Sequence, residues 1–455
     1  MINQSRRSFL KSKLALGACL GAGLDVISAP ARAADLQGYR ALVCIYLAGG
    51  NDSYNMFVPV SASAHRDYAD ARKFLALPRE QILPVTPVSY SDGQAYGFHP
   101  AMTQSQRLFG EGKLAVMANV GSLIRPITRQ EYDDRGPAVP RQLFSHNDQT
   151  DSWLAADARG AAGVGWAGRM IDLMYPNGAP QPSPSISIGG NSLWQTGRRV
   201  RAFEVGTRGV GNRYLPYHRG PVKLSDAFRA MHENAAQESN LMAREHAMTL
   251  ERAEAFGNTV NSALEFAPVF SQPFPEGFLA AQLEMVAKLI AVRDRMDTNL
   301  TRQVFFVRIG GWDTHDDQAS AGTDVHANLL REVDVALSAF DDAVTELGES
   351  ESVTSFTATE FGRTLTPNGS GTDHGWGGHN LILGGAVRGG DVYGEMPLIA
   401  LESENALRAG RMIPTSSVDQ YCATLARWFG LNESELASVF PNLRNFSTGD
   451  LGFMA

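Results

Sequence analysis

The sequence predicts an α/β protein with three layers, in which a mostly parallel central sheet lies between two layers of helices. Three apolar runs, 41–48, 303–309 and 353–359, are typical of central strands, because strands covered on both faces are continuously apolar. Glycines or an acid follow each run directly. A helical pattern at 328–347 joins the last two runs, and a strand–helix–strand unit of this kind predicts a right-handed parallel crossover.

The first 33 residues are expected to form an export signal that is removed. Residues 5–11, SRRSFLK, match a twin-arginine signal, and an apolar stretch from Leu14 to Ile27 follows. Ala31-Arg32-Ala33 supplies the small-x-small cleavage site, so the mature chain is expected to begin at Ala34. We therefore expect a periplasmic protein whose export partner is the twin-arginine translocation machinery. Beyond Ala33, no apolar run reaches the roughly 18 residues that a membrane span needs.

The charge of the chain excludes some classes of partner. The formal net charge is −8, and removal of the leader takes away five basic residues and one acid, which leaves −12. This acidic balance argues against nucleic acids and anionic membrane surfaces as partners. An anionic substrate would need a local positive centre, such as a metal ion.

The remaining elements are expected in this order. The pattern predicts a helix that ends at Leu108 and a buried strand at 113–121. A Gly- and Pro-rich insertion or cap at 160–222 and helical segments at 224–260 and 278–297 together form a region at 160–300. Small helices at 419–439 close the domain. Cys44 and Cys422 either pair or remain as two buried thiols, which are the two states that the sequence leaves open.

Acids and histidines follow the strands at the edge where α/β proteins bind ligands. Asp52 follows Gly49-Gly50, Asp313 and His315 follow Gly310-Gly311, and Glu360 follows the 353–359 run. A Gly/Pro/Asn-rich loop then brings Asp373 and His374, with His379 as a further candidate. Taken singly, each residue has a structural explanation, such as a helix cap or a turn. Together they predict one or two divalent cations, Zn, Ca, Mg or Mn, bound by Asp52, Asp313, His315, Glu360, Asp373 and His374.

Ser145 is the candidate nucleophile. It lies at the start of an expected helix around Trp153, where a serine is usually a cap. The amino end of a helix also favours an anion, which suits an attacking oxygen. The alternatives are therefore catalysis by Ser145, attack by water at the metal, and a cap without catalytic role.

Motifs along nearly the whole mature chain resemble one family. They are LAGGNDSYN at 47–55, GFHPAM at 97–102, LFGEGKLAVMANVG at 108–121, FSHND at 144–148, GGWDTH at 310–315, TEFGRT at 359–364, GTDHGWGGHNLILGG at 371–385 and VRGGDVYG at 387–394. The chain resembles the twin-arginine-exported proteins of domain of unknown function 1501, in the alkaline phosphatase and sulfatase superfamily. The resemblance implies one alkaline-phosphatase-like domain at 34–455.

The same resemblance implies roles for single residues. Asp52 matches the metal aspartate of the first strand, and Asp313 with His315 matches an aspartate–histidine pair. Asp373-His374 resembles the last histidine-bearing loop. Phe361 stands where the superfamily usually has a histidine, so that a second metal site would lack one ligand.

Two functions compete on this sequence. The first is a metal-dependent hydrolase of phosphate or sulfate esters, whose substrate would be a small anionic ester. The second is a non-catalytic periplasmic binding or assembly protein that keeps the fold. Redox chemistry ranks last, because the chain has neither a cysteine cluster nor a dinucleotide fingerprint.

Overall fold

A computed structural model describes most of the mature chain. The described residues are 38–136, 138–160, 163–176, 183–211, 240–296, 300–319 and 324–455, together with 230 and 234. The expected leader at 1–33 and the first part of the expected helix at 224–260 lie outside them. Asp35–Ala455 forms one compact unit.

The central sheet contains nine of the described strands. Eight follow the order β13-β5-β12-β9-β1-β8-β6-β7, and β14 pairs with β5. Their bounds are β1 Arg40–Leu47, β5 Leu114–Gly121, β6 Ser185–Ser187, β7 Phe203–Glu204, β8 Arg302–Ile309, β9 Val353–Ala358, β12 Gly378–Leu383, β13 Val392–Tyr393 and β14 Ser416–Ser417. Among these strands, β12 runs antiparallel to its neighbours β5 and β9, and all other pairings are parallel. The predicted mostly parallel sheet is confirmed.

Two smaller sheets flank the carboxyl edge of the central one. β2 (Phe57–Pro59), β3 (Leu83–Val85) and β4 (Tyr96–Phe98) form an antiparallel sheet in the order β2-β4-β3. β10 (Arg363–Pro367) and β11 (Thr372–His374) form an antiparallel hairpin. The stretch expected as a loop between Glu360 and His379 therefore contains this hairpin and the start of β12.

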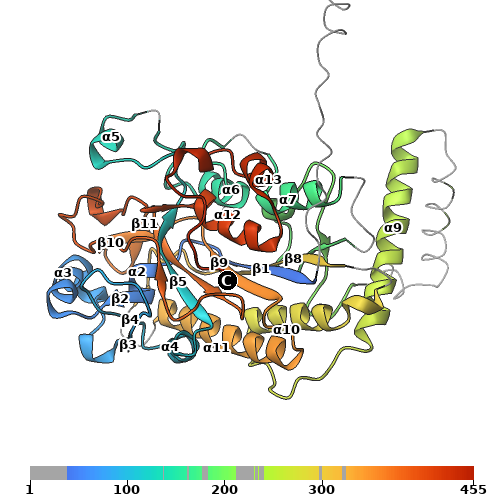
Figure 1. The fold of residues 1–455 in the computed structure, drawn as a ribbon, viewed down its shortest axis with the longest axis horizontal. Coiled ribbons are helices and arrows are strands. Elements are labelled where there is room, and N and C mark those ends of the chain that lie inside the picture. Colours follow the sequence, from blue (N-terminus) through green and yellow to red (C-terminus); the bar gives the residue numbers. More distant parts are fainter. Residues whose placement is uncertain are drawn as a thin grey trace, which may run out of the picture. The chain divides into compact units, whose positions relative to one another are not determined.

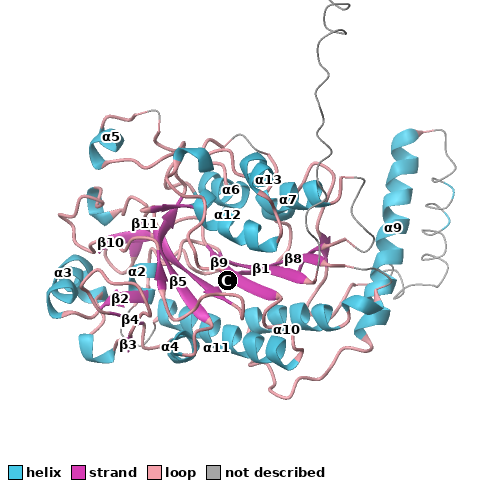
Figure 2. Ribbon diagram, viewed as in Figure 1, coloured by secondary structure: helices cyan, strands magenta, loops and turns pink. Residues whose placement is uncertain are grey.

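Helices cover both faces of the central sheet, as the cyan elements on either side of the magenta strands in Figure 2 show. One face carries α4 (Thr103–Gly110), α10 (Phe278–Ala291) and α11 (Val325–Glu346), and the other carries α6 (His146–Ala155), α7 (Trp166–Met174), α12 (Val418–Phe429) and α13 (Glu433–Val439) (Figure 1). The remaining described helices are α2 (Ser53–Met56), α3 (Ala62–Arg72), α5 (Arg129–Asp133) and α9 (Leu241–Leu264). This arrangement is the three-layer α/β/α architecture expected from the sequence.

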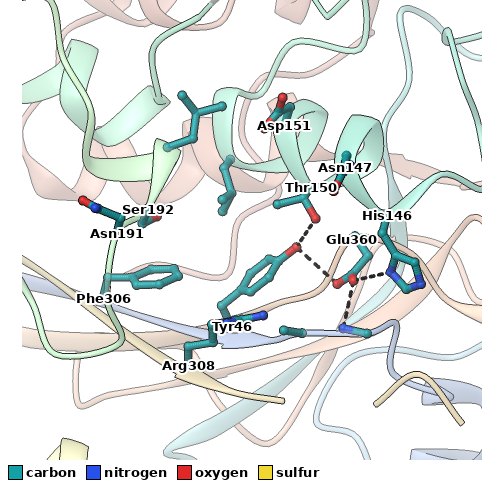
Figure 3. Close-up of a pocket in the computed structure, with 14 residues that line it drawn as sticks. Tyr46, His146, Asn147, Thr150, Asp151, Asn191, Ser192, Phe306, Arg308 and Glu360 are labelled. Atoms are coloured by element: carbon teal, nitrogen blue, oxygen red, sulfur yellow. Dashed lines mark hydrogen bonds and ion pairs between the residues drawn. The ribbon is translucent and has the colours of Figure 1, made fainter. Parts of the chain in front are cut away.

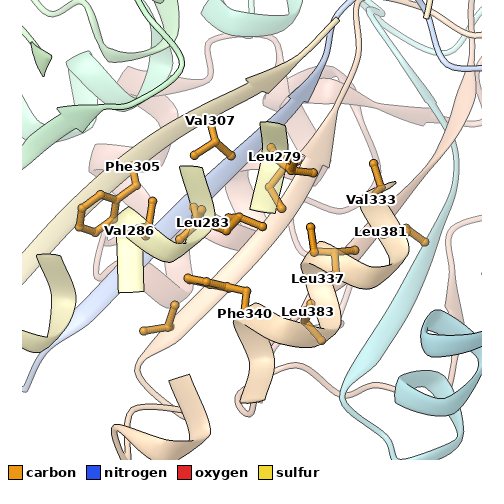
Figure 4. Close-up of a cluster of buried hydrophobic side chains, with 14 of the residues drawn as sticks. Leu279, Leu283, Val286, Phe305, Val307, Val333, Leu337, Phe340, Leu381 and Leu383 are labelled. Atoms are coloured by element: carbon orange, nitrogen blue, oxygen red, sulfur yellow. The ribbon is translucent and has the colours of Figure 1, made fainter. Parts of the chain in front are cut away.

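The alternation of side chains along the strands divides the core into two halves. On the α10–α11 face, Phe305 and Val307 of β8 pack against Leu283 of α10 and Leu337 and Phe340 of α11 (Figure 4). On the other face the core is aromatic, and its ring contacts include those among Trp166, Trp194, Phe306, Phe356 and Tyr421. Because both faces are covered, β1 and the middle of β8 have continuous apolar sequences. Cys44 and Cys422 are both buried free thiols.

The segment at 160–300 contributes more than loops to the fold. Its strands β6 and β7 extend the central sheet beyond β8, and α10 packs under β8. No described helix is long and apolar enough to cross a membrane.

Candidate metal centre and the pocket beside it

Histidines and acids from four segments meet at the carboxyl edge of the sheet. Asp313 and His315 follow β8, and Glu360 follows β9. His146 is the first residue of α6, and His374 is the last residue of β11. Parallel strands end at the same edge, so residues that directly follow β8 and β9 are brought close together.

Three imidazole rings converge on the Asp313 carboxylate. Nε2 of His146 lies 3.3 Å from Asp313 Oδ2, and Nε2 of His315 and of His374 lie 3.1 and 3.3 Å from Oδ1. One ligand atom from each of His146, Asp313 and His374 can be chosen so that all three lie within 4.8 Å of one another. Two or three imidazoles with one carboxylate form a common ligand set for zinc in proteins.

The other ring nitrogen of each histidine is held by an oxygen. His146 Nδ1 lies 2.9 Å from Glu360 Oε1, His315 Nδ1 lies 3.2 Å from Asp373 Oδ1, and His374 Nδ1 lies 2.7 Å from the Phe144 carbonyl oxygen. These oxygens accept hydrogen bonds, so each Nδ1 can donate to its partner, and the Nε2 of a neutral ring then has a lone pair for a metal ion. This is the arrangement by which proteins orient histidines toward a metal ion.

The contact between two of the rings also fits a cation. His315 Nε2 and His374 Nε2 are 2.8 Å apart. With hydrogen on both Nδ1 atoms, two lone pairs face each other and repel. A proton or a metal ion between the nitrogens removes that repulsion, so the residues present fit the ion that their chemistry suggests.

Local charges shift the pKa values in this cluster in different directions. The hydrogen bond from His146 to Glu360 raises the pKa of His146. Burial lowers the pKa of His374, which leaves this ring neutral and able to bind a metal near pH 7. Partial burial acts to raise the pKa of Asp313, but the hydrogen bond and charge of Arg363 outweigh burial and lower it. Asp313 is therefore an anion at neutral pH.

Arg363 fixes the position of the Asp313 carboxylate. Its side chain is fully buried, and Nη1 donates to Asp313 Oδ1 over 2.8 Å and to the Gly49 carbonyl over 3.2 Å. It also donates to the hydroxyl and the carbonyl oxygen of Thr372. One guanidinium thus joins the loops after β1 and β8 to β11, and it supplies a fixed positive charge beside the site.

Gly49 allows the backbones of two loops to touch. Its φ is +127°, and a Cβ built there would lie 2.3 Å from the backbone nitrogen of Asp313. The close approach lets the Gly49 N–H donate to Glu360 Oε1 over 2.8 Å. A residue with a side chain would therefore push the loop that carries Asp313 away from the end of β1.

A strained turn brings the start of α6 to the site. Gln142 and Phe144 have φ values of 51° and 71°, a backbone conformation that is uncommon for residues other than glycine. The turn directs the Phe144 carbonyl at His374, and the Arg411 guanidinium covers the Phe144 ring at 4.8 Å. Strain of this kind persists where the surrounding structure holds it, and it clusters at functional sites.

Comparison with known protein families assigns the chain to one of them. The family model described as "Protein of unknown function (DUF1501)" matches residues 39–439. The chain belongs to the DUF1501 family. A comparison with curated proteins found no match.

Solved structures that resemble this DUF1501 protein are distant. The C-terminal periplasmic domain of EcEptC from Escherichia coli, in complex with Zn, is 7% identical with a TM-score of 0.35, over 88% of this chain and 85% of that chain. Ps i-CgsB, in complex with k-i-k-neocarrahexaose, is 8% identical with a TM-score of 0.34, over 90% and 77%. A mutant of alkaline phosphatase PafA is 10% identical with a TM-score of 0.30, over 72% and 64%. Likenesses this distant say nothing about the substrate of the DUF1501 chain.

The structure brings five of the residues predicted from the sequence to one place. Asp313, His315 and His374 form the cluster itself, while Glu360 and Asp373 bind the far side of two of its histidines. That Glu360 and Asp373 contact the ion directly stays a prediction.

Asp52 and Ser145 have other partners in this DUF1501 protein. Asp52 is fully buried, and its Oδ2 accepts from the side chains of Arg72 and Gln318. Ser145 is the N-cap of α6, but its hydroxyl donates to Asp148 Oδ2 over 2.6 Å and caps no backbone N–H. Both sequence-based roles, metal ligand for Asp52 and nucleophile for Ser145, stay predictions.

Sequence reasoning missed His146. Its contact with Glu360 spans 214 positions, so no local pattern joins the two. The FSHND motif at 144–148 contains the signal. Its serine is the predicted nucleophile, and the histidine that follows the serine is the residue that reaches the cluster.

A pocket of about 580 Å³ adjoins the cluster (Figure 3). His146 and Glu360 line it at the histidine cluster. The other lining residues come from the ends of β1 and β8, from α6 and from residues 191–193. Pockets of this size hold small organic ligands.

The oxygens behind the histidines give a first prediction for the DUF1501 site. Glu360→Gln removes the charge that orients His146 and should lower metal affinity about 10- to 100-fold, since partners behind metal ligands usually contribute that much. Titration with Zn²⁺ against a competing chelator measures the effect. Glu80→Gln, at an exposed glutamate on another surface, is the control. Equal affinity of the Glu360→Gln variant and the native chain would remove Glu360 from the site.

Proposed function

We propose that this chain is an exported, metal-dependent hydrolase of phosphate or sulfate esters. The observation that carries the proposal is the convergence of Nε2 of His146, His315 and His374 on Asp313. This donor set lies at the edge of the sheet where α/β enzymes bind substrates, beside a pocket of suitable size. Among Zn, Ca, Mg and Mn, a site rich in imidazole favours Zn.

A divalent ion there would supply positive charge for the oxygens of a phosphate or sulfate group and would lower the pKa of a nucleophile. Residues of the chain itself hold and orient the side chains that would bind the ion. Glu360 and the Phe144 carbonyl fix the orientation of His146 and His374, and Arg363 fixes Asp313. The Arg363 guanidinium is buried, so its part is to position Asp313 and it does not touch substrate.

Ser145 is the proposed nucleophile. It directly precedes His146, so its hydroxyl is carried by the same turn that brings His146 to the cluster. Asp148 accepts a hydrogen bond from the Ser145 hydroxyl over 2.6 Å and can take up its proton. The amino end of α6 favours the resulting oxyanion. Water is the alternative nucleophile.

Metal analysis and an ester panel test the proposal. Purified protein should contain a divalent metal and should hydrolyse members of a panel of aryl phosphates and aryl sulfates after loading with Zn, Mn, Mg or Ca. EDTA should abolish the activity, and the metal should restore it. Absence of hydrolysis with every ion, in protein shown to bind metal, would contradict the hydrolase and favour a non-catalytic periplasmic binding protein.

The nucleophile has its own test. Ser145→Ala should abolish ester hydrolysis while leaving metal content unchanged, because the lost hydroxyl does not contact the three histidines. We expect little loss of stability, well under the roughly 1 kcal/mol of a typical N-cap, because this hydroxyl caps no backbone N–H. Asp133→Asn, at an exposed acid of α5, is the control for effects of substitution and purification that do not involve the site. Full activity in Ser145→Ala would assign the attack to water.

Export is tested at the leader. Replacing both Arg6 and Arg7 by lysine should leave the precursor in the cytoplasm, because the twin-arginine translocation machinery recognises that pair. Cell fractionation with immunoblotting of the full chain measures the outcome. Replacing Lys11 and Lys13 by arginine keeps the charge of the leader and serves as the control. Mature protein in the periplasm of the double-lysine variant would contradict twin-arginine export.

A further inference from the structure

The pocket beside the histidines has a floor, a wall and a rim from different elements. Tyr46 of β1 and Phe306 of β8 form the floor, and their ring centroids are 6.0 Å apart. Thr150 and Leu154 belong to the wall made by α6, and the loop at 191–193 forms the rim. Figure 3 shows Tyr46, Phe306, Thr150 and Ser192 around one open space. The floor is largely aromatic, which suits a flat or apolar group.

Tyr46 connects this pocket to the metal centre. Its hydroxyl donates to Glu360 Oε2 over 3.2 Å and shares a 2.9 Å hydrogen bond with Thr150 Oγ1. Glu360 in turn contacts His146. An ester group bound at the histidines would therefore have its alcohol part directed over Tyr46 into the pocket.

Arg308 places an available positive charge at the floor. Tyr46 and Arg308 are paired in the parallel register of β1 and β8, so their side chains leave the same face of the sheet about 5 Å apart. Gln282 binds both backbone groups of Arg308, at 3.0 and 2.9 Å, and thereby fixes this end of the strand. The Arg308 side chain is exposed and has no hydrogen-bond or ion-pair partner within the described ranges.

The acids around the pocket define where a second negative charge can bind. Glu360 already accepts from Gly49 and Tyr46 and contacts His146. Asp151, on the α6 wall, would repel an acid and favours a hydroxyl or another donor. Within this lining, an acidic group of the ligand is therefore directed toward Arg308.

We propose that the pocket binds the alcohol part of the ester, and that this part carries a compact apolar or aromatic group and a second acidic group that Arg308 recognises. The assignment of this part to an ester rests on the proposed function. The acidic group can be a carboxylate, a phosphate or a sulfate, because a guanidinium binds all three through paired N–H donors.

Binding of small aromatic probes tests this proposal without any hydrolysis. 4-Fluorobenzoate and its neutral analogue 4-fluorobenzamide are titrated against the purified protein by fluorine NMR, with and without EDTA. The native chain should bind the benzoate about tenfold more tightly than the amide, as a hydrogen-bonded charge pair usually contributes. Arg308→Gln should remove that preference and should leave the affinity for the amide unchanged. Arg66→Gln, at an exposed arginine of α3, is the control and should leave both affinities unchanged.

Three outcomes would overturn the proposal. They are equal binding of both probes by the native chain, unchanged benzoate binding by Arg308→Gln, and benzoate binding that EDTA removes, which would place the anion at the metal. Leu193→Trp places a large side chain at the rim and should weaken the binding of both probes. It provides a second variant if Arg308→Gln fails to fold. Hydrolysis of methyl phosphate, whose alcohol part is too small to fill the pocket, reports on the histidine cluster in the same samples, so failure of the pocket and failure of the hydrolase are told apart.

Discussion

Asp313→Asn should lower metal affinity by more than about 100-fold and abolish ester hydrolysis. The carboxylate lies within 3.3 Å of Nε2 of three histidines, so a cation held by these rings would contact its negative charge. Partners behind metal ligands already contribute about 10- to 100-fold, and a group at the centre should contribute more. Mass spectrometry of the purified variant measures the metal content.

The stability of the same variant provides a second measurement. An ion present at 100 times its dissociation constant stabilises the native state by about 2.7 kcal/mol, and this increment should be missing from Asp313→Asn. Denaturation with and without EDTA isolates the increment, since the native chain should respond to EDTA and the variant should not. Asp317→Asn, in the same loop and at a φ of 55° that asparagine tolerates, is the matched control. Metal content equal to that of the native chain would place the ion elsewhere.

The central strands were predictable because burial on both faces leaves a continuous apolar pattern. The run predicted at 303–309 is β8, Arg302–Ile309, and the helix predicted at 328–347 is α11, Val325–Glu346. β12 was not predicted. Its residues His379 and Asn380 are polar and buried. His379 Nδ1 accepts from the Asn119 N–H and Asn380 Oδ1 accepts from the Thr357 hydroxyl, and these partners lie 260 and 23 positions away. A local pattern cannot show hydrogen bonds over such separations, so the segment resembles a loop in sequence.

The candidate site was predictable to the extent that strand ends define it. Asp313 with His315, and Asp373 with His374, are each close in sequence and reach the same edge. His146 comes from a helix start after a strained turn, and no periodic pattern encodes that position. The rule about strand ends also cannot tell whether a carboxylate faces an ion or an arginine, as Asp52 illustrates.

Arg72→Met should lower the free energy of unfolding by about 3–5 kcal/mol, the usual effect of removing one partner of a buried ion pair. Arg72 and Asp52 are both fully buried, and the Arg72 guanidinium also donates to the carbonyl oxygens of Thr364 and Leu365. Asp52 Oδ1 has no hydrogen-bond partner among the described residues, so without Arg72 this carboxylate would keep only its contact with Gln318. Denaturant unfolding in EDTA measures the loss independently of any metal.

A double variant and an exposed pair complete the test. Adding Asp52→Asn to Arg72→Met should recover part of the lost stability, because it removes the charge that was left without its partner. Arg107→Met breaks the Arg107–Glu111 pair, whose side chains are 39% and 41% exposed, and should cost less than about 1 kcal/mol. If Arg72→Met costs no more than this surface variant, then the buried pair does not hold α3 to the start of α2. Asp52 then keeps its charge for another partner, which the sequence predicts to be a metal ion.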